Sequence, residues 1–119
     1  MAQKLTVLIP CRDEERNIQA CIDAARLVAD EILVADSGSI DRTLEIVQRQ
    51  EDVRLIERTF VGYADFKNWA IPQATHPWVL IVDADERVTQ SLAEEIRGLL
   101  ESTPEKIDAY WVYRRNFFL

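Results

Sequence analysis

The sequence predicts an α/β fold: a three-layer sandwich in which helices cover both faces of a mainly parallel sheet. Short apolar runs alternate along the chain with segments whose apolar residues recur at helical spacing. Strands that alternate with helices of about 10–15 residues form parallel sheets through right-handed crossovers. The first apolar run is hydrophobic at consecutive positions, which is typical of a strand buried on both faces.

The first strand is expected at residues 4–10, where Pro10 ends the apolar run, and the first helix from Glu14 to about Val28. The other elements follow in the same alternation. We expect strands at residues 31–37, 53–58, 78–83 and 109–118, and helices at residues 41–50, 64–75 and 89–101.

Two local features mark the ends of predicted helices. Ser39 or Asp41 can accept hydrogen bonds from the free N–H groups at the start of the helix at residues 41–50. Pro72 is expected to kink or end its helix, because proline has no N–H group and clashes with the preceding turn. No internal repeat or linker interrupts the chain, so residues 1–119 are expected to form a single domain.

The composition excludes several classes of protein. The chain is 48% hydrophobic and 29% charged, which is typical of a globular protein, and its 14 basic and 21 acidic residues give a net charge of −7. There is no basic stripe, so nucleic-acid binding is not expected. An acidic protein that binds an anionic ligand usually needs a metal cation between the two.

Cysteine content and hydropathy point to a cytoplasmic protein. Cys11 and Cys21 match no metal-ligand spacing and are expected to be reduced and partly buried. No apolar run approaches the roughly 20 residues that a transmembrane helix needs, and no signal peptide is recognised. Peripheral association with a membrane remains compatible with the sequence.

Acidic segments follow three of the predicted strands. "CRDEE" follows the first strand, "DSGS" the second and "DADE" the fourth. Ligands of open α/β sheets bind beyond the carboxyl ends of the strands, so these segments are candidates for a binding site. Acids at helix N-termini also interact favourably with the helix dipole, so a structural role stays open for Glu14, Glu15 and Asp36.

The third acidic segment indicates a metal. On extended backbone, Asp83 and Asp85 would project to the same side, with the small Ala84 between them. Two carboxylates held close together repel each other, and a divalent cation removes the conflict. A few oxygen ligands fit Mg²⁺ or Mn²⁺, which keep several waters and bridge to substrate phosphates.

Asp36, Gly38 and Lys67 are candidates for nucleotide binding. Gly38 permits a tight turn after the second strand, where Asp36 can accept hydrogen bonds from a ribose hydroxyl or a base N–H group. Lys67 is one of few cations in the central region and could contact a phosphate or base. A solvated helix lysine is the alternative.

Four segments together resemble the family 2 glycosyltransferases of the GT-A fold. They are "VLIPCRDEERNI", "EILVADSGSIDRTLEI", "GYADFKNWAI" and "WVLIVDADERV". The subgroup of bacterial lipopolysaccharide core glycosyltransferases is the closer match, and "YRRNFFL" also fits it. The resemblance covers nearly the whole chain, and its most specific part is the ordered set D-S-G-S-x-D-R-T, K-N and D-A-D-E-R.

This resemblance implies transfer of a sugar, with inversion, from a nucleotide-diphosphate donor of the UDP-hexose type to a lipopolysaccharide core or similar surface glycan. It implies that the loop Pro10–Glu14, which includes Arg12 and Asp13, holds the nucleoside together with Asp36. Lys67 would lie near the base or diphosphate. Asp83 would lie toward ribose and metal, and Asp85 would be the main metal ligand.

The chain departs from the family in three respects, one of which is Pro72 inside its helix. Many members carry Tyr-Asn where this chain has Arg12 and Asp13. Members also continue into an acceptor-binding half. Residues 1–119 are therefore expected to form the donor-binding half, and the general base is expected beyond Leu119. We expect negligible transferase activity from this chain alone. The protein would act in the cytoplasm at the inner face of the membrane.

The aromatic segment at the end of the chain predicts self-association. Its rings would lose their cover if the acceptor-binding half is missing, and exposed apolar surface favours dimers or aggregates. These aromatic residues are Tyr110, Trp111, Tyr113, Phe117 and Phe118.

Three other functions are compatible with an acidic α/β domain. A non-catalytic nucleotide- and metal-binding module would differ from the enzyme only in the residues beyond Leu119. A phospho-receiver domain expects a different order of its aspartate and lysine, and the third strand here ends in "ERT". A nucleotidyltransferase would have a glycine-rich basic loop after the first strand, whereas "PCRDEE" contains no glycine.

Overall fold

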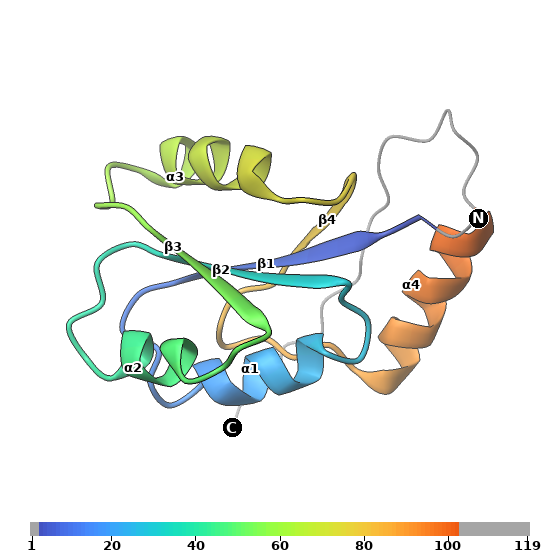
Figure 1. The fold of residues 1–119 in the computed structure, drawn as a ribbon, viewed down its shortest axis with the longest axis horizontal. Coiled ribbons are helices and arrows are strands. Elements are labelled where there is room, and N and C mark those ends of the chain that lie inside the picture. The colour runs from blue at the N-terminus through green and yellow to red at the C-terminus, as the bar shows by residue number, and fades with distance from the viewer. Residues whose placement is uncertain (1–2, 103–119) are drawn as a thin grey trace, which may run out of the picture.

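The computed structural model describes residues 3–102 and contains one four-stranded sheet in the order β3-β2-β1-β4 (Figure 1). All three pairs of neighbouring strands are parallel, which confirms the predicted class. The strands are β1 (Leu5–Cys11), β2 (Glu31–Asp36), β3 (Val53–Glu57) and β4 (Trp78–Ile81).

Helices cover both faces of the sheet, so the three-layer arrangement is also confirmed. In Figure 1, α1 and α2 lie below the sheet and α3 lies above it, while α4 packs beside α1. The helices are α1 (Ile18–Ala25), α2 (Thr43–Gln48), α3 (Tyr63–Ala70) and α4 (Gln90–Ser102), and the short 3₁₀ helix η1 (Ile71–Gln73) follows α3.

The core has two parts because successive side chains of a strand point to opposite faces. Val7 and Ile9 of β1 pack with Ile22 of α1 in the larger part, which also includes residues of α4. Leu8, between them in the sequence, packs on the other face with Phe66 of α3. β1 is therefore buried on both faces, as its continuous apolar sequence predicts.

The strand register places the loops that follow the strands at one edge of the sheet. Cys11 at the end of β1 is aligned with Asp36 at the end of β2, and Asp36 is aligned with Glu57 at the end of β3. The N–H group of Val82, just after β4, donates to the carbonyl oxygen of Leu8 (3.0 Å). The segments that follow the four strands therefore begin at the same edge.

The predicted bounds of the first helix were wrong. α1 begins at Ile18 rather than Glu14, because the backbone at Asp13 adopts a left-handed conformation (φ 53°) and the chain turns before the helix starts. The N–H group of Glu14 donates to the hydroxyl of Thr43 (2.8 Å) rather than within a helix. At the other end, a tight turn in which Val28 N–H donates to the carbonyl of Ala25 (3.1 Å) ends the helix.

Pro72 acts as predicted. α3 ends at Ala70, and Pro72 lies in the short 3₁₀ helix that follows it. The expected strand at residues 109–118 lies outside the described residues, together with its aromatic side chains. The self-association inferred from these side chains therefore stays a prediction. No helix within residues 3–102 has both the length and the apolar character that crossing a bilayer requires.

Both cysteines are free thiols, and both are buried. Burial raises the pKa of the Cys11 thiol, and the neighbouring Asp36 carboxylate raises it further. Burial also raises the pKa of Cys21, to about 11. A raised pKa keeps the thiol protonated, and only the thiolate is the reactive form. Both side chains therefore act here as small core residues with a weak hydrogen-bond donor.

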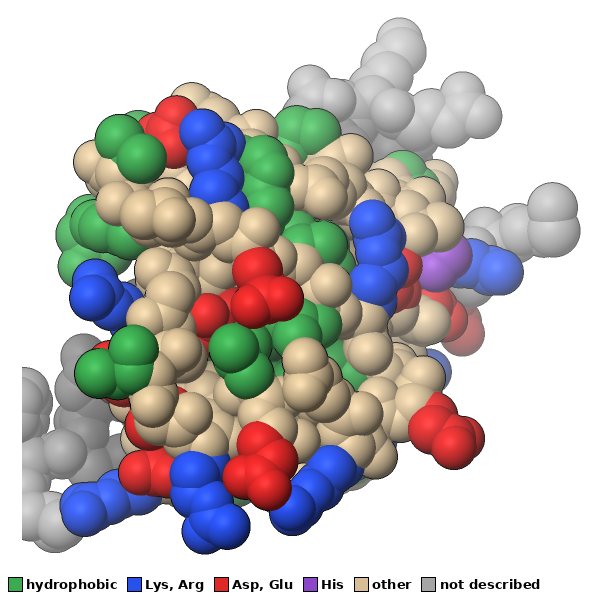
Figure 2. All heavy atoms as spheres, turned by 60° about the vertical axis from the view of Figure 1, so that its left-hand side comes forward, with side chains coloured by type: hydrophobic (Ala, Val, Ile, Leu, Met, Phe, Trp, Pro, Cys, Tyr) green, Lys and Arg blue, Asp and Glu red, His purple; other side chains and the backbone are tan. Residues whose placement is uncertain are grey.

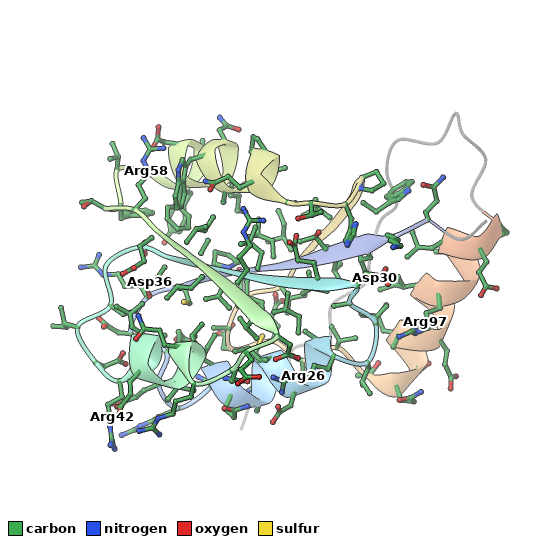
Figure 3. All side chains as sticks on the ribbon, in the orientation of Figure 1. Arg26, Asp30, Asp36, Arg42, Arg58 and Arg97 are labelled. Atoms are coloured by element: carbon green, nitrogen blue, oxygen red, sulfur yellow. The ribbon has the colours of Figure 1, made fainter. Side chains whose placement is uncertain are left out.

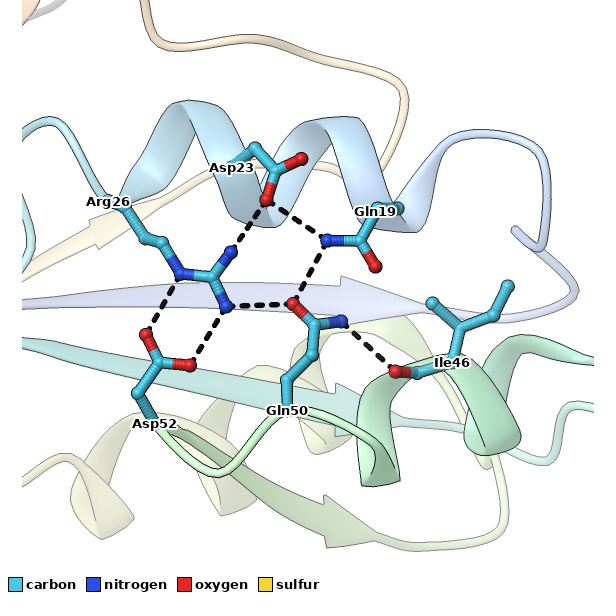
Figure 4. Close-up of polar contacts among 6 residues, drawn as sticks. All are labelled: Gln19, Asp23, Arg26, Ile46, Gln50 and Asp52. Atoms are coloured by element: carbon cyan, nitrogen blue, oxygen red, sulfur yellow. Dashed lines mark hydrogen bonds and ion pairs between the residues drawn. The ribbon is translucent and has the colours of Figure 1, made fainter.

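A polar network fastens α1 to the turn between α2 and β3 (Figure 4). The guanidinium of Arg26 donates to both carboxylate oxygens of Asp52 (2.9 and 2.8 Å) and to Asp23 (2.6 Å). It also donates to the side-chain oxygen of Gln50 (2.8 Å), whose amide nitrogen donates to the carbonyl of Ile46 (3.0 Å). This network holds two helices of the lower layer together at the surface.

Glu31 organises the opposite edge of the sheet, away from the loops that follow the strands. Its carboxylate accepts hydrogen bonds from the hydroxyl of Thr6 (2.9 Å) and from the N–H and hydroxyl groups of Thr75 (2.9 and 2.6 Å). Arg54 of β3 donates to it as well (3.3 Å). Glu31 thus connects three strands with the segment that precedes β4.

This arrangement predicts a pH-dependent contribution to stability. Burial opposes ionisation of Glu31, but the hydrogen bonds from Thr75 and its other neighbours outweigh burial and lower the pKa of the carboxyl to about 2. The stabilisation is therefore complete above about pH 4.5 and is lost as the pH falls toward 2. Urea unfolding should show that Glu31→Gln lowers the free energy of unfolding at pH 7 by on the order of 3 kcal/mol.

The difference between wild type and Glu31→Gln should shrink as the pH falls, because protonated Glu31 and glutamine are both neutral. A difference that is the same at pH 7 and at pH 2.5 would contradict this account. Exposed Glu94→Gln on α4 is the matched control, and it should leave the pH dependence of stability unchanged.

Candidate functional site

The candidate site is formed by the segments that follow the strands: residues 12–17 after β1, 37–42 after β2, 58–62 after β3 and 82–89 after β4. Figure 2 views the molecule from this edge. Acidic side chains lie near the middle of that face, next to hydrophobic ones, and basic side chains lie mainly toward its periphery.

Asp36 is buried at the end of β2, with 1% of its surface exposed (Figure 3). One carboxylate oxygen accepts hydrogen bonds from the N–H groups of Gly38 (2.9 Å) and Ser39 (2.8 Å). The other accepts from the Ser39 hydroxyl (2.5 Å) and the Cys11 thiol (3.5 Å). All four acceptor positions of the carboxylate are therefore occupied by its own surroundings.

Gly38 is required by the turn that surrounds Asp36. Its backbone has a φ of 114°, which side-chain-bearing residues rarely adopt. With this conformation the next N–H group points back at the Asp36 carboxylate. The sequence correctly indicated a tight turn at this position.

Hydrogen bonds join the loop after β1 to the loop after β2. Asp13 accepts from the N–H groups of Ile40 (2.8 Å) and Asp41 (3.3 Å), and its own N–H donates to the Ser39 hydroxyl (2.8 Å). In addition, Glu15 N–H donates to the Asp41 carboxylate (3.2 Å). Ser39 and Asp41 therefore help to fix the shape of both loops. The sequence predicted only their hydrogen bonds to the start of the following helix, where Asp41 accepts from Thr43 N–H (2.9 Å), and not the contacts between the loops.

A pocket of about 290 Å³ opens beside Asp36, between the loops that follow β2 and β3. Arg58, labelled in Figure 3, connects this pocket to α3. Its guanidinium pairs with Asp65 (3.2 Å) and lies 5.7 Å from the centre of the Trp69 ring. The pocket is lined by Asp36, Gly38, Ser39, Leu44, Glu57, Arg58 and Thr59. Sequence reasoning missed Arg58, because a single cation after a strand has no distinctive pattern.

The D-A-D-E segment forms a turn rather than the end of a strand. β4 ends at Ile81, and the N–H group of Glu86 donates to the carbonyl of Asp83 (2.9 Å) across Ala84 and Asp85. The predicted extended backbone at Asp83 and Asp85 was therefore wrong. Both aspartates instead belong to the turn that this hydrogen bond closes.

Both aspartates of this turn keep their carboxylates available. Asp83 is half-buried, Asp85 is exposed and Ala84 is buried. Within residues 3–102, no hydrogen bond or ion pair involves either carboxylate, although the backbone N–H of Asp83 donates to Glu86 (2.8 Å). Two oxygen ligands without protein partners suit Mg²⁺ or Mn²⁺, which take carboxylate and phosphate oxygens and retain waters.

The protein offers few other ligands for a metal. No group of three or more histidine, cysteine or acidic side chains in the described part of the chain could hold one. A cation at this turn would therefore need most of its ligands from water and from a bound ligand. This donor set fits a cation that is shared with a phosphate group and does not fit a closed structural site.

The other predicted site residues are spread over the same edge. Pro10 is aligned with Ala35 near the ends of β1 and β2, and Arg12 beyond it is exposed. Glu14 is half-buried, and its carboxylate accepts from the side-chain amide of Asn17 (3.5 Å). Lys67 is exposed on α3 and does not line the pocket.

A family model described as Glycosyl transferase family 2 matches residues 6–118. The chain belongs to this family. The resemblance noted in the sequence is therefore confirmed. Three of the four segments that carry it include the loops described above, whereas the fourth, which contains Lys67, forms α3.

Curated relatives support this assignment. The lipopolysaccharide core biosynthesis glycosyltransferase LpsC of Rhizobium meliloti is 35% identical over 119 residues, which cover 97% of this chain and 43% of LpsC. The uncharacterized glycosyltransferase RT0209 of Rickettsia typhi is 30% identical, and the match covers 94% of this chain and 37% of that protein. The chain thus spans about two fifths of the length of these relatives.

Solved structures of glycosyltransferases share the fold. The mannosyltransferase PcManGT of Pyrobaculum calidifontis, in complex with GDP-Man and Mn²⁺, superposes with a TM-score of 0.70 at 29% identity over 87% of this chain and 34% of its own. S. aureus TarS in complex with UDP-GlcNAc gives a TM-score of 0.67 at 24% identity over 82% of this chain and 31% of TarS. The glycosyltransferase GT-A architecture expected from the sequence is confirmed.

Proposed function

We propose that this chain is the donor-binding part of a metal-dependent, inverting glycosyltransferase. The observation that carries this proposal is the turn after β4, which presents the carboxylates of Asp83 and Asp85 without protein partners among the described residues, at the edge of the sheet where the pocket lies. The donor would be a nucleotide-diphosphate sugar, and the cation would be Mg²⁺ or Mn²⁺.

The pocket beside Asp36 is the proposed site of the nucleoside. Its volume of about 290 Å³ and its mixture of apolar and polar walls are suited to part of a nucleotide. Because the hydrogen-bonding capacity of Asp36 is already used, this residue would serve mainly by holding Gly38 and Ser39 in place as walls of the pocket. Pro10, Arg12, Asp13 and Glu14 would border the nucleoside from the β1 side.

Asp85 would be the main ligand of the cation, with Asp83 beside it and toward the ribose. Ala84 leaves space for close approach of the donor, and Lys67 of α3 would supply a positive charge for the diphosphate. A cation bound here would neutralise the charge that grows on the departing nucleoside diphosphate. The structural neighbour PcManGT, solved in complex with GDP-Man and Mn²⁺, supports the pairing of a nucleotide-sugar with a divalent cation on this fold.

The acceptor is proposed to be a lipopolysaccharide core or a similar surface glycan. The support for this class is the 35% identity with LpsC. With a membrane-anchored glycolipid as acceptor, the protein would work at the inner face of the cytoplasmic membrane. We assign the role of general base to none of the described residues.

Calorimetric titration with UDP, GDP, CDP and ADP, with and without Mn²⁺, tests the proposed donor. We expect UDP to bind most tightly, because the resemblance favours a UDP-hexose, and we expect Mn²⁺ to strengthen its binding. If none of the four nucleotides binds in the presence of Mn²⁺, the chain is not a donor-binding domain. Tighter binding of another nucleotide would change the proposed base of the donor and would leave the proposed donor-binding function in place.

A further inference from the structure

Arg87 joins the turn after β4 to the loop after β1. One terminal nitrogen of its guanidinium donates to the carbonyl oxygens of Ala84 and Glu86 (2.8 Å each). The other donates to the side-chain oxygen of Asn17 (3.1 Å), which is 70 positions away in the sequence. A single side chain therefore fixes the backbone on which both proposed metal ligands lie.

The same turn is fastened at its other end by different groups. Cys21 of α1 donates its thiol hydrogen to the carbonyl oxygen of Asp83 (3.5 Å), whose N–H group donates to the Glu86 carboxylate (2.8 Å). The backbone of the turn is thus held from both α1 and Arg87. The carboxylates of Asp83 and Asp85, in contrast, have no partner within residues 3–102.

Arg87 could affect a bound cation in two ways of opposite sign. Its positive charge repels a cation nearby, so by charge alone Arg87 would weaken metal binding. Its hydrogen bonds fix the turn in advance, so by geometry it would strengthen metal binding, because less conformational entropy is lost when the cation binds. The sign of the effect on metal affinity therefore distinguishes the two roles.

We propose that Arg87 is a positioning residue for the divalent cation, and that its hydrogen bonds to the turn outweigh its repulsion of the metal. This inference rests on the proposed function, since it assumes that the turn holds a cation. The planar guanidinium supplies several N–H donors in a fixed arrangement, which lysine cannot reproduce. The contact with Asn17 ties the turn after β4 to the loop after β1.

The test measures Mn²⁺ affinity of the 119-residue chain by electron paramagnetic resonance, in the presence of saturating UDP. Arg87→Gln and Arg87→Lys should each bind Mn²⁺ about 10-fold more weakly than wild type, as is typical when a group that orients metal ligands is lost. UDP affinity without metal should stay at the wild-type value in both variants, which a general loss of structure would not allow.

Arg97→Gln is the matched control. Arg97 on α4 also donates two N–H groups to a backbone carbonyl, that of Leu27 (3.0 and 2.7 Å), but it lies at the opposite side of the molecule from Asp36 (Figure 3). Its replacement removes the same charge and the same type of contact. Mn²⁺ affinity of Arg97→Gln should equal that of wild type.

Each other outcome overturns the proposal. If Arg87→Gln binds Mn²⁺ as tightly as wild type or more tightly, while Asp85→Asn loses binding, Arg87 is not a positioning residue but the metal site stands. If Asp85→Asn has no effect either, or wild type binds no Mn²⁺, the proposed function fails as well. Should Arg87→Gln unfold, Asn17→Ala gives the second measurement: it must weaken Mn²⁺ binding, because it removes the contact between the loops and leaves the charge of Arg87 in place.

Discussion

Replacing Asp85 by asparagine is expected to weaken the binding of Mn²⁺ in the presence of UDP by about 100-fold. Groups that only orient metal ligands typically contribute about 10- to 100-fold to affinity, so a direct ligand should be at the upper end of that range. The asparagine side chain has almost the same shape but carries no charge, and hard cations such as Mg²⁺ and Mn²⁺ depend on charged oxygen ligands. Asp85 is exposed and has no hydrogen-bond partner within the described residues, so its replacement should leave folding unchanged.

Two matched variants make this result interpretable. Glu94→Gln on α4 removes one negative charge from the exposed surface and should leave Mn²⁺ binding unchanged. Asp83→Asn should weaken binding less than Asp85→Asn, because the resemblance to the family assigns Asp83 partly to the ribose. Equal Mn²⁺ affinity of Asp85→Asn and wild type, measured by calorimetry, would remove Asp85 from the metal site.

Replacing Asp36 by alanine is expected to lower the free energy of unfolding by about 3 kcal/mol and to abolish nucleotide binding. The carboxylate accepts four hydrogen bonds, including those of Gly38 N–H and Ser39 N–H, and the residue is 1% exposed. A buried N–H or O–H group that loses a charged acceptor destabilises the fold by more than a neutral hydrogen bond stabilises it. Without this acceptor, the loop that forms one wall of the pocket loses its shape.

Asp36→Asn provides a graded comparison, because asparagine keeps one acceptor oxygen in the same place. Urea unfolding should place its stability between wild type and Asp36→Ala, and UDP titration should show weakened binding. If Asp36→Ala were as stable as wild type and bound UDP normally, the loop would not depend on this carboxylate.

The fold could be predicted from the sequence because its main determinants are local. The continuous apolar run of β1 places Val7 and Leu8 on opposite faces, and both are buried. Pro72 ends α3 because of its own covalent structure. The acidic residues at the strand ends come to one edge because parallel strands all point the same way.

The shape of the loops could not be predicted, because it depends on side chains that contact distant backbone. The hydroxyl of Thr43 accepts a hydrogen bond from Glu14 N–H, which helps to delay the start of α1 until Ile18. Arg87 reaches Asn17 across 70 positions of sequence. Neither contact leaves a periodic pattern in the sequence. The acidic residues could therefore be predicted as ligands, but the residues that hold their backbone could not.

The coupling between Mn²⁺ and UDP tests most directly whether a cation at the Asp83–Asp85 turn bridges the protein to a diphosphate. Calorimetry would measure UDP affinity with and without Mn²⁺, and the Mn²⁺ affinity with and without UDP, with uridine as the control that lacks phosphates. A bridging cation requires that each ligand strengthens the other by the same factor, since binding free energies are reciprocal. We expect this mutual strengthening for UDP and none for uridine. Equal UDP affinity in the presence and absence of Mn²⁺, under conditions where both ligands bind, would contradict the bridge.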